Sequence, residues 1–594
     1  MKDILMIQIQ CFDFIKGYTR SFKALSALII SALLLLASAP LSHARGETDI
    51  LGEYLSARVA ENLGDYSKAV FFYKKIFADD AVIDSVSTDI LSRAHTLFLI
   101  EGEMEWARRL NDKIISEYPK DQTAQLAKIV FLVTDGKPEQ ARKRLDLFAT
   151  TGIGAYTTQL FKAWLLAADN KTDLALKTLD SGKQSALGNL FNVHRGLINE
   201  MAGRFDKAAG NFRDLGWPNG VLSARISRDL IRVDLKSGNV DEAKAVLKAA
   251  KAGQPDSRFF NDIDAMIDGK TKPGPAIQSV KQGIAYALLD VARIIERSQN
   301  RSLIRLISQL VLYLNPDLAP GRILLAKLYT APYATDKAIK LLQGIPADSP
   351  YYWQAGLEIA VLEDRKGDLD KAEARLTKMI SENPHWISPA LLLGNIMRIR
   401  KQDEKAIKAY DAALRRIGTP DKRFWRTLYS RGISLERSGQ WKRAEKDLLA
   451  ALKLEPNAPF VLNYLGYSWI DKGINLDKAI AMIEKAVKLR PRDGYIIDSL
   501  GWGYYKLMRY PEAVQELEKA IELVPADPVI NDHLGDAYWR VGRTIEARFQ
   551  WNRALLMKPE KDNEKSIRLK IRNGLKDPAP APSAVKSSAA PDNG

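Results

Sequence analysis

The chain has 594 residues, of which 46% are hydrophobic and 27% charged, with a formal net charge of +16 at neutral pH. This balance is typical of a folded chain and excludes an intrinsically disordered one, which has too few hydrophobic residues to form a core. The single cysteine, Cys11, excludes a disulfide framework and a cysteine-based zinc site.

Residues 1–44 have the features of a secretory signal. Arg20 and Lys23 precede an apolar run over 24–37, and small residues stand at −3 and −1 from a cut after Ala44. Cys11 lies before the apolar run, so it cannot be the lipidated cysteine that follows such a run in a bacterial lipoprotein. We therefore expect an exported, periplasmic protein. The alternative is an uncleaved segment that anchors the chain in the inner membrane, although 14 to 16 apolar residues are short for a span.

The positive charge has to be interpreted together with export. Residues 1–44 carry four basic and two acidic side chains, so the remainder keeps a net charge of +14. An exported protein rarely meets nucleic acid, and we expect no nucleic-acid partner. Anionic membrane lipid, lipopolysaccharide or a cell-wall polymer are stronger candidates. A well-solvated surface with excess lysine explains the charge equally well.

A repeated pattern follows, and it is clearest around four glycines at intervals of 34 or 35 residues: Gly432, Gly466, Gly501 and Gly535. Each glycine is followed 12 or 13 residues later by an alanine and 24 or 25 residues later by a proline. Small residues let two antiparallel helices approach closely, and the apolar residues between them fall on one helical stripe. The proline ends the second helix of the unit. The pattern resembles the tetratricopeptide repeat (TPR), a helix–turn–helix unit of 34 residues.

Weaker copies extend the resemblance over roughly residues 48–560. Fourteen units are expected, six before an interruption and eight after it. The resemblance implies an all-α fold, a TPR helix–turn–helix solenoid wound as a right-handed superhelix. The expected organisation is a signal peptide at 1–44, an N-terminal array at 45–251, a hinge or loop at 252–282, a C-terminal array at 283–559, a polar capping helix at 560–576 and a disordered Pro/Ala-rich tail at 577–594.

Two glycine-containing stretches invite a nucleotide interpretation. The GxG at Gly501 and Gly503 lacks the third glycine of a dinucleotide site, and no strand precedes it. The stretch Gly269-Lys270-Thr271 lacks the first glycine of a phosphate loop, because Asp264 stands there, and prolines follow it. Both are better explained structurally, Gly501 by helix packing and the second stretch by a loop.

A search for catalytic or metal-binding motifs finds little. Four histidines lie beyond the signal segment (His95, His194, His385 and His533), and none belongs to an HExxH motif. His95 falls on a packing position of its unit. No GxSxG motif occurs. We expect no enzyme, no cofactor and no metal, although a spatially assembled catalytic cluster would escape sequence analysis.

The remaining expectation is binding. The TPR resemblance implies that the first helix of each unit lines a concave groove. In the last three units the groove positions carry large aromatic side chains that packing does not require, and such clusters mark interaction surfaces. The alternative is that neighbouring units or the capping helix cover these rings. The predicted partner-binding residues are Asn463, Tyr467, Tyr495, Asp498, Trp502, Tyr505, Lys506, Asp532, Trp539 and Arg540.

The family's carboxylate clamp, which binds chaperone C-termini, is absent, because its lysine and asparagine positions hold other residues. The function that follows is a non-enzymatic scaffold that presents the groove to protein segments of the cell envelope. The alternative is a carbohydrate-binding module for cell-wall glycan, since stacked aromatic rings beside amide and carboxylate groups also suit a sugar chain.

Overall fold

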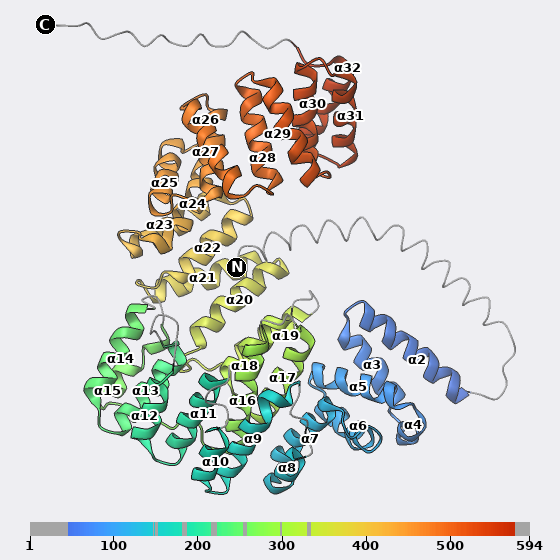
Figure 1. Cartoon of the computed structure of the whole chain (residues 1–594), viewed down its shortest axis with the longest axis vertical. Helices are drawn as coiled ribbons and strands as arrows, with labels where there is room; N and C mark the ends of the chain where they lie inside the picture. Colours follow the sequence, from blue (N-terminus) through green and yellow to red (C-terminus); the bar gives the residue numbers. More distant parts are fainter. Residues whose placement is uncertain are drawn as a thin grey trace. The chain divides into compact units, whose positions relative to one another are not determined.

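The computed structural model describes residues 45–146, 148, 152–180, 187–215, 222–253, 258–296, 300–329 and 334–576 (Figure 1). All regular elements in these ranges are helices, and no strand occurs among them. The predicted all-α fold is therefore confirmed. The predicted signal segment, 1–44, and the predicted disordered tail, 577–594, lie outside the described residues. The described part of the chain divides into two compact units, the first within residues 45–246 and 266–334 and the second within residues 247–265 and 335–576.

The first unit begins with helices joined in pairs by short turns, so that each first helix is followed by an antiparallel second helix. The pairs are α2 (Arg45–Asn62) with α3 (Tyr66–Ile76), α5 (Thr88–Glu101) with α6 (Met104–Glu117), α7 (Gln122–Thr134) with α8 (Pro138–Leu145), α9 (Gly154–Ala168) with α10 (Thr172–Thr178), α11 (Gly188–Met201) with α12 (Phe205–Arg213), and α13 (Ala224–Lys236) with α14 (Val240–Gly253). The unit boundary after Val246 falls inside α14. The short helix α4 (Asp80–Ser85) links the first two pairs.

The turn inside a pair needs one residue with a left-handed backbone. Glycine supplies it in most pairs, as at Gly102 with φ 80° and Gly136 with φ 71°. Where the sequence has no glycine at this place, another residue adopts the same conformation, as at Asn170 with φ 58° and Met508 with φ 61°. The turn is therefore imposed by the packing of the two helices, and glycine only lowers its conformational cost.

Three further helices complete the first unit: α16 (Val280–Ile295), α17 (Arg301–Leu314) and α18 (Ala319–Leu328). Instead of continuing the stack, α16 packs against α9, and α17 packs against α5 and α7 (Figure 1). All three of these partners are first helices. This packing departs from the sequence expectation, in which residues from 283 onward simply extend a second array.

The second unit contains the short helices η4 (Arg258–Phe260) and α15 (Ile263–Ile267), the latter ending at the boundary with the first unit. A run of longer helices follows and returns to the paired pattern. These are α19 (Thr335–Gln343), α20 (Tyr352–Lys366), α21 (Leu369–Glu382), α22 (Ser388–Ile399), α23 (Asp403–Ile417), η7 (Lys422–Phe424), α24 (Trp425–Arg437), α25 (Trp441–Leu454), α26 (Pro459–Asp471), α27 (Leu476–Leu489), α28 (Gly494–Lys506), α29 (Tyr510–Leu523), α30 (Pro528–Arg540), α31 (Thr544–Leu556) and α32 (Lys561–Asn573).

Gly501 stands where α28 crosses α29. A methyl group added at this glycine would lie 2.6 Å from Cγ of Leu517 and 3.2 Å from the carbonyl oxygen of Ala513. The side chain of Leu517 fills the space, and the backbone carbonyl cannot easily move away. The packing role predicted for Gly501 is thereby confirmed.

Candidate functional site

The predicted groove residues lie on the first helices α26, α28 and α30 of the second unit. Of those on α26 and α28, all but Asp498 are exposed or half-buried: Tyr467 is half-buried, Tyr495 is 42% exposed and Lys506 is exposed. Asn463 is half-buried too, and its Oδ1 accepts no hydrogen bond from the described residues. Burial, with the nearby Asp471 and Asp498 carboxylates, raises the pKa of Tyr467 to about 12.

Trp502 is the centre of an aromatic cluster between α28 and α30. Its ring stacks on Tyr505, with centroids 4.6 Å apart and planes 7° apart. It also stacks on His533, with centroids 3.9 Å apart and planes 13° apart. Two rings that both lie nearly parallel to the indole and this close to it fit only on its opposite faces. Trp502 is therefore held between Tyr505 and His533, and neither indole face is free.

His533 links this cluster to a carboxylate, a connection that sequence analysis missed. Its Nδ1 lies 2.9 Å from Oδ1 of Asp498 and donates to it. Burial alone would lower the pKa of His533, but the carboxylates of Asp498, Asp532 and Asp536 outweigh burial and raise the pKa above its usual value. A protonated imidazole against the Trp502 ring is also favoured by a cation–π interaction. The only sequence signal for His533 was its place on a first helix.

The last helix, α32, covers the end of the predicted groove. Nζ of Lys570 lies 2.9 Å from Asp532 and 2.8 Å from Asp536, and these three side chains are between 6% and 18% exposed. Arg540 donates to the backbone oxygen of Lys576 at 2.8 Å. α32 therefore occupies the first-helix face of the last pair as well as ending the stack.

One ammonium group shared by two carboxylates leaves this contact with a net negative charge. Burial raises the pKa of Asp536, an effect that Lys570 opposes and Asp532 reinforces. Burial would lower the pKa of Lys570, but the two carboxylates outweigh it and raise the pKa. The contact thus depends on Lys570 remaining charged.

Trp539 belongs to the same covered end. Its ring packs on Trp551 with centroids 5.6 Å apart, and the guanidinium carbon of Arg548 lies 4.9 Å from its centroid. Gly574, directly after α32, lies so close that an added methyl group would be 2.0 Å from the Trp539 ring. Of the predicted aromatic residues, Trp539 is thus covered by internal packing, whereas Tyr495 keeps 42% of its surface exposed.

The first-helix face of the first unit is occupied by α16 and α17, and polar contacts fix both helices there. On α16, Asp290 binds Arg225 through two hydrogen bonds of 2.6 and 3.1 Å and lies 3.5 Å from His194. Burial alone would raise the pKa of Asp290, but Arg225 and His194 outweigh burial and lower it. On α17, Arg305 pairs with Glu101.

Close packing fixes α16 as firmly as these ion pairs. At Gly283, an added methyl group would lie 2.3 Å from the Trp164 ring of α9. Nothing in the repeat pattern pointed to this arrangement.

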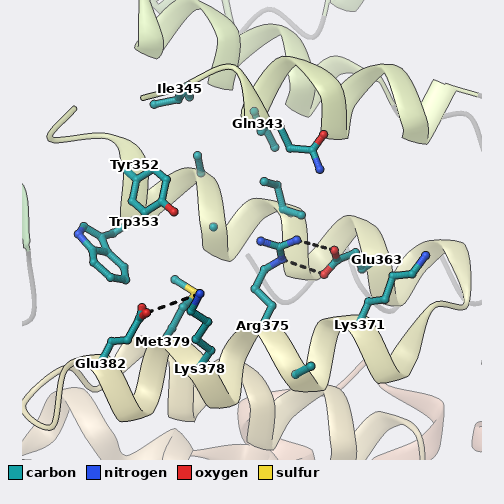
Figure 2. A pocket seen from close by; sticks show the side chains of 15 residues that line it. Gln343, Ile345, Tyr352, Trp353, Glu363, Lys371, Arg375, Lys378, Met379 and Glu382 are labelled. Atoms are coloured by element: carbon teal, nitrogen blue, oxygen red, sulfur yellow. Dashed lines mark hydrogen bonds and ion pairs between the residues drawn. The ribbon is translucent and has the colours of Figure 1, made fainter. Parts of the chain in front are cut away.

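A separate cavity of about 520 Å³ lies among α19, α20 and α21 in the second unit (Figure 2). Figure 2 shows Arg375 on α21 paired with Glu363 on α20, through hydrogen bonds of 2.9 and 2.7 Å, and Tyr352 and Trp353 nearer the other end. None of the predicted groove residues lines this cavity. Each of its three cations, Lys371, Arg375 and Lys378, is paired with a carboxylate, so the cavity offers no distinct chemistry.

The described residues hold no group of three or more histidine, cysteine or acidic side chains able to bind a metal. Among the described helices, none is long and apolar enough to cross a membrane.

Antiparallel helix pairs stacked through small residues define a helical-repeat solenoid. The second unit carries tetratricopeptide repeats: the TPR repeat model matches residues 501–542, and the tetratricopeptide repeat model matches residues 429–494. A curated relative, TPR repeat-containing protein PA4667 of Pseudomonas aeruginosa, is 33% identical over 150 residues. This match spans only a quarter of each of the two chains.

Two solved structures match the chain with TM-scores below 0.5. The Cut9–Hcn1 hetero-tetramer of APC/C has 14% identity and a TM-score of 0.36, with 83% of this chain and 97% of that chain covered. YrrB, described as a TPR protein with an unusual peptide-binding site, has 19% identity and a TM-score of 0.26, with 32% of this chain and 97% of that chain covered.

Proposed function

We propose that the chain is a non-enzymatic scaffold that binds protein segments of the cell envelope through first helices of its second unit. TPR repeats are in general protein-interaction scaffolds. The observation that carries the proposal is that first-helix faces are occupied by other helices of the same chain. In the first unit this face binds α16 and α17, and at the end of the second unit it binds α32. Such a face therefore accepts helices through apolar packing supported by ion pairs.

The part of the face on α26 and α28 is suited to an external segment. Tyr495 and Lys506 are exposed there, and Tyr467 is half-buried. The cluster around Trp502 provides a rigid base, because its rings already hold one another in place.

The envelope location rests on residues 1–44, whose sequence supports export to the periplasm or, alternatively, anchoring in the inner membrane. Cell-wall glycan stays the alternative ligand and an anionic membrane surface a further one. Stacking of a sugar needs a free aromatic face, and Trp502 has none. Tyr495 is the most exposed of the predicted aromatic residues, at 42%.

The test compares ligands on one immobilised chain: peptides from envelope proteins, soluble cell-wall fragments and anionic vesicles. Tyr495→Ala together with Lys506→Ala should weaken peptide binding by about tenfold or more, if these changes together cost at least about 1.4 kcal/mol. Phe549→Ala is the control, because Phe549 is an aromatic side chain on the second helix α31 and is 61% exposed. If the wild-type chain binds glycan but not peptide, the carbohydrate alternative is favoured. If the control variant loses as much binding as the groove variant, the groove residues do not belong to the binding site.

A further inference from the structure

The outer side of α2 carries a stripe of exposed apolar side chains. Leu51, Leu55, Val59 and Leu63 recur every four residues and are between 50% and 78% exposed. The opposite side of the same helix buries Ala57. A helix that is apolar on both sides is normally buried on both. Exposed apolar stripes of this kind mark interaction sites.

The position of α2 in the stack explains why the stripe needs a cover. Inside the array, the corresponding side of a first helix packs on the preceding pair, as α5 packs on α3. The terminal helix of a repeat array needs a polar outer face. At the C-terminal end of the repeats α32 provides one, since Ile567 is its only fully buried residue. α2 instead presents leucines and valine.

A groove runs beside the stripe. Small residues, Gly52, Ser56 and Ala60, follow the same four-residue spacing, and an added methyl group at Gly52 would touch nothing within 4 Å. Between α2 and α3 the groove has a volume of about 430 Å³ and is lined by Leu55, Val59 and Ser56 on α2 and by Phe72 on α3. One helix thus carries both a ridge of large side chains and a groove of small ones.

We propose that this face pairs with the same face of a second copy of the chain. Rows of side chains spaced by four form the ridges and grooves that helices interlock. When ridge and groove lie side by side on one helix, a two-fold axis places the ridge of each copy into the groove of the other, which is the self-complementarity that a symmetric dimer requires.

The charge around the stripe permits this pairing. Residues 45–77, which contain α2 and α3, carry five basic and five acidic side chains, so their net charge is zero. The whole chain carries +16, so two copies repel each other overall, and a neutral face adds nothing to that repulsion. The α2–α3 face is a neutral region in a basic chain.

Sedimentation of the full chain, in the form purified from its own cells, tests the proposal. Wild type should form a dimer, and Leu55→Glu with Val59→Glu should weaken self-association by at least about a hundredfold, because two apolar contacts per copy become buried charges. Leu174→Glu on α10 is the matched control, since Leu174 is 51% exposed outside the stripe. The control should dimerise like wild type. Circular dichroism must show unchanged helicity in all variants.

A crosslink locates the contact. Ser56 lies in the middle of the groove, so Ser56→Cys in a Cys11→Ser background should form a disulfide-linked dimer under mild oxidation, whereas Leu174→Cys should not. A chain that stays monomeric at all concentrations would refute the proposal, as would a dimer indifferent to Leu55→Glu. A monomer whose stripe is covered by a different protein would also refute it.

Discussion

The contact between Lys570 and the two aspartates gives a quantitative test of how α32 is held. Lys570→Ala removes the only cation at hydrogen-bond distance from both Asp532 and Asp536 among the described residues. Removing one partner of a buried ion pair typically costs about 3–5 kcal/mol, and the remaining exposure of Asp532 places the expected cost near about 3 kcal/mol. The rest of α32 contributes one fully buried side chain, Ile567.

A loss of about 3 kcal/mol raises the population of detached α32 by roughly 150-fold, since each 1.4 kcal/mol is a factor of ten. Hydrogen exchange of the α32 amides should accelerate by about the same factor if α32 opens as a local unit. The detached state would also uncover Asp532 and Asp536 and should increase capture of basic segments.

Arg568→Ala is the control on the same helix. Arg568 is 65% exposed and pairs only with Glu564 one turn away, so its loss should change stability by at most about 0.5 kcal/mol. If exchange of α32 in Lys570→Ala is no faster than in Arg568→Ala, the ion pairs do not hold the helix and apolar packing alone does.

Four other predictions follow from single positions. Gly501→Ala should destabilise α28 and α29 by up to about 2 kcal/mol, because overpacking outweighs the higher helix propensity of alanine. Gly210→Ala should stabilise α12 by up to about 1 kcal/mol, because an added methyl group there meets nothing within 4 Å. Hydrogen-exchange rates of the amides in these helices measure both effects. Burial lowers the pKa of His95 from its usual value to about 4. The unfolded chain therefore takes up a proton first, and about 3 kcal/mol of stability present above pH 6.5 should be lost between pH 6.5 and 4; urea unfolding of wild type and His95→Gln checks the slope. Asp290→Ala strands a buried arginine and should release α16 at a cost of about 3–5 kcal/mol, seen as new protease cleavage there. Met508→Gly should stabilise its turn by about 0.5–1 kcal/mol, measured as slower exchange in the flanking helices, because φ is 61° at this methionine.

The candidate site shows where sequence reasoning succeeded and where it stopped. The repeat register placed Tyr467, Tyr495 and Trp502 on first helices, and the structure confirms their positions. The register could not reveal that His533 covers one face of Trp502, nor that Gly574 packs against Trp539. These contacts join different helices, and side-chain stacking leaves no periodic signal in the sequence.

The sequence by itself determined the helical repeat. Each unit packs only on its neighbours, so the small residues and prolines that specify it recur at a fixed interval, and the spacing alone assigns Gly501 to a helix crossing. The tertiary structure alone decided what lies on the first-helix faces. Arg305 and Glu101 are 204 residues apart, and the return of α17 to α5 depends on shape and charge complementarity between distant segments. Such complementarity leaves no repeating pattern in the sequence, so it can be recognised only in the folded structure.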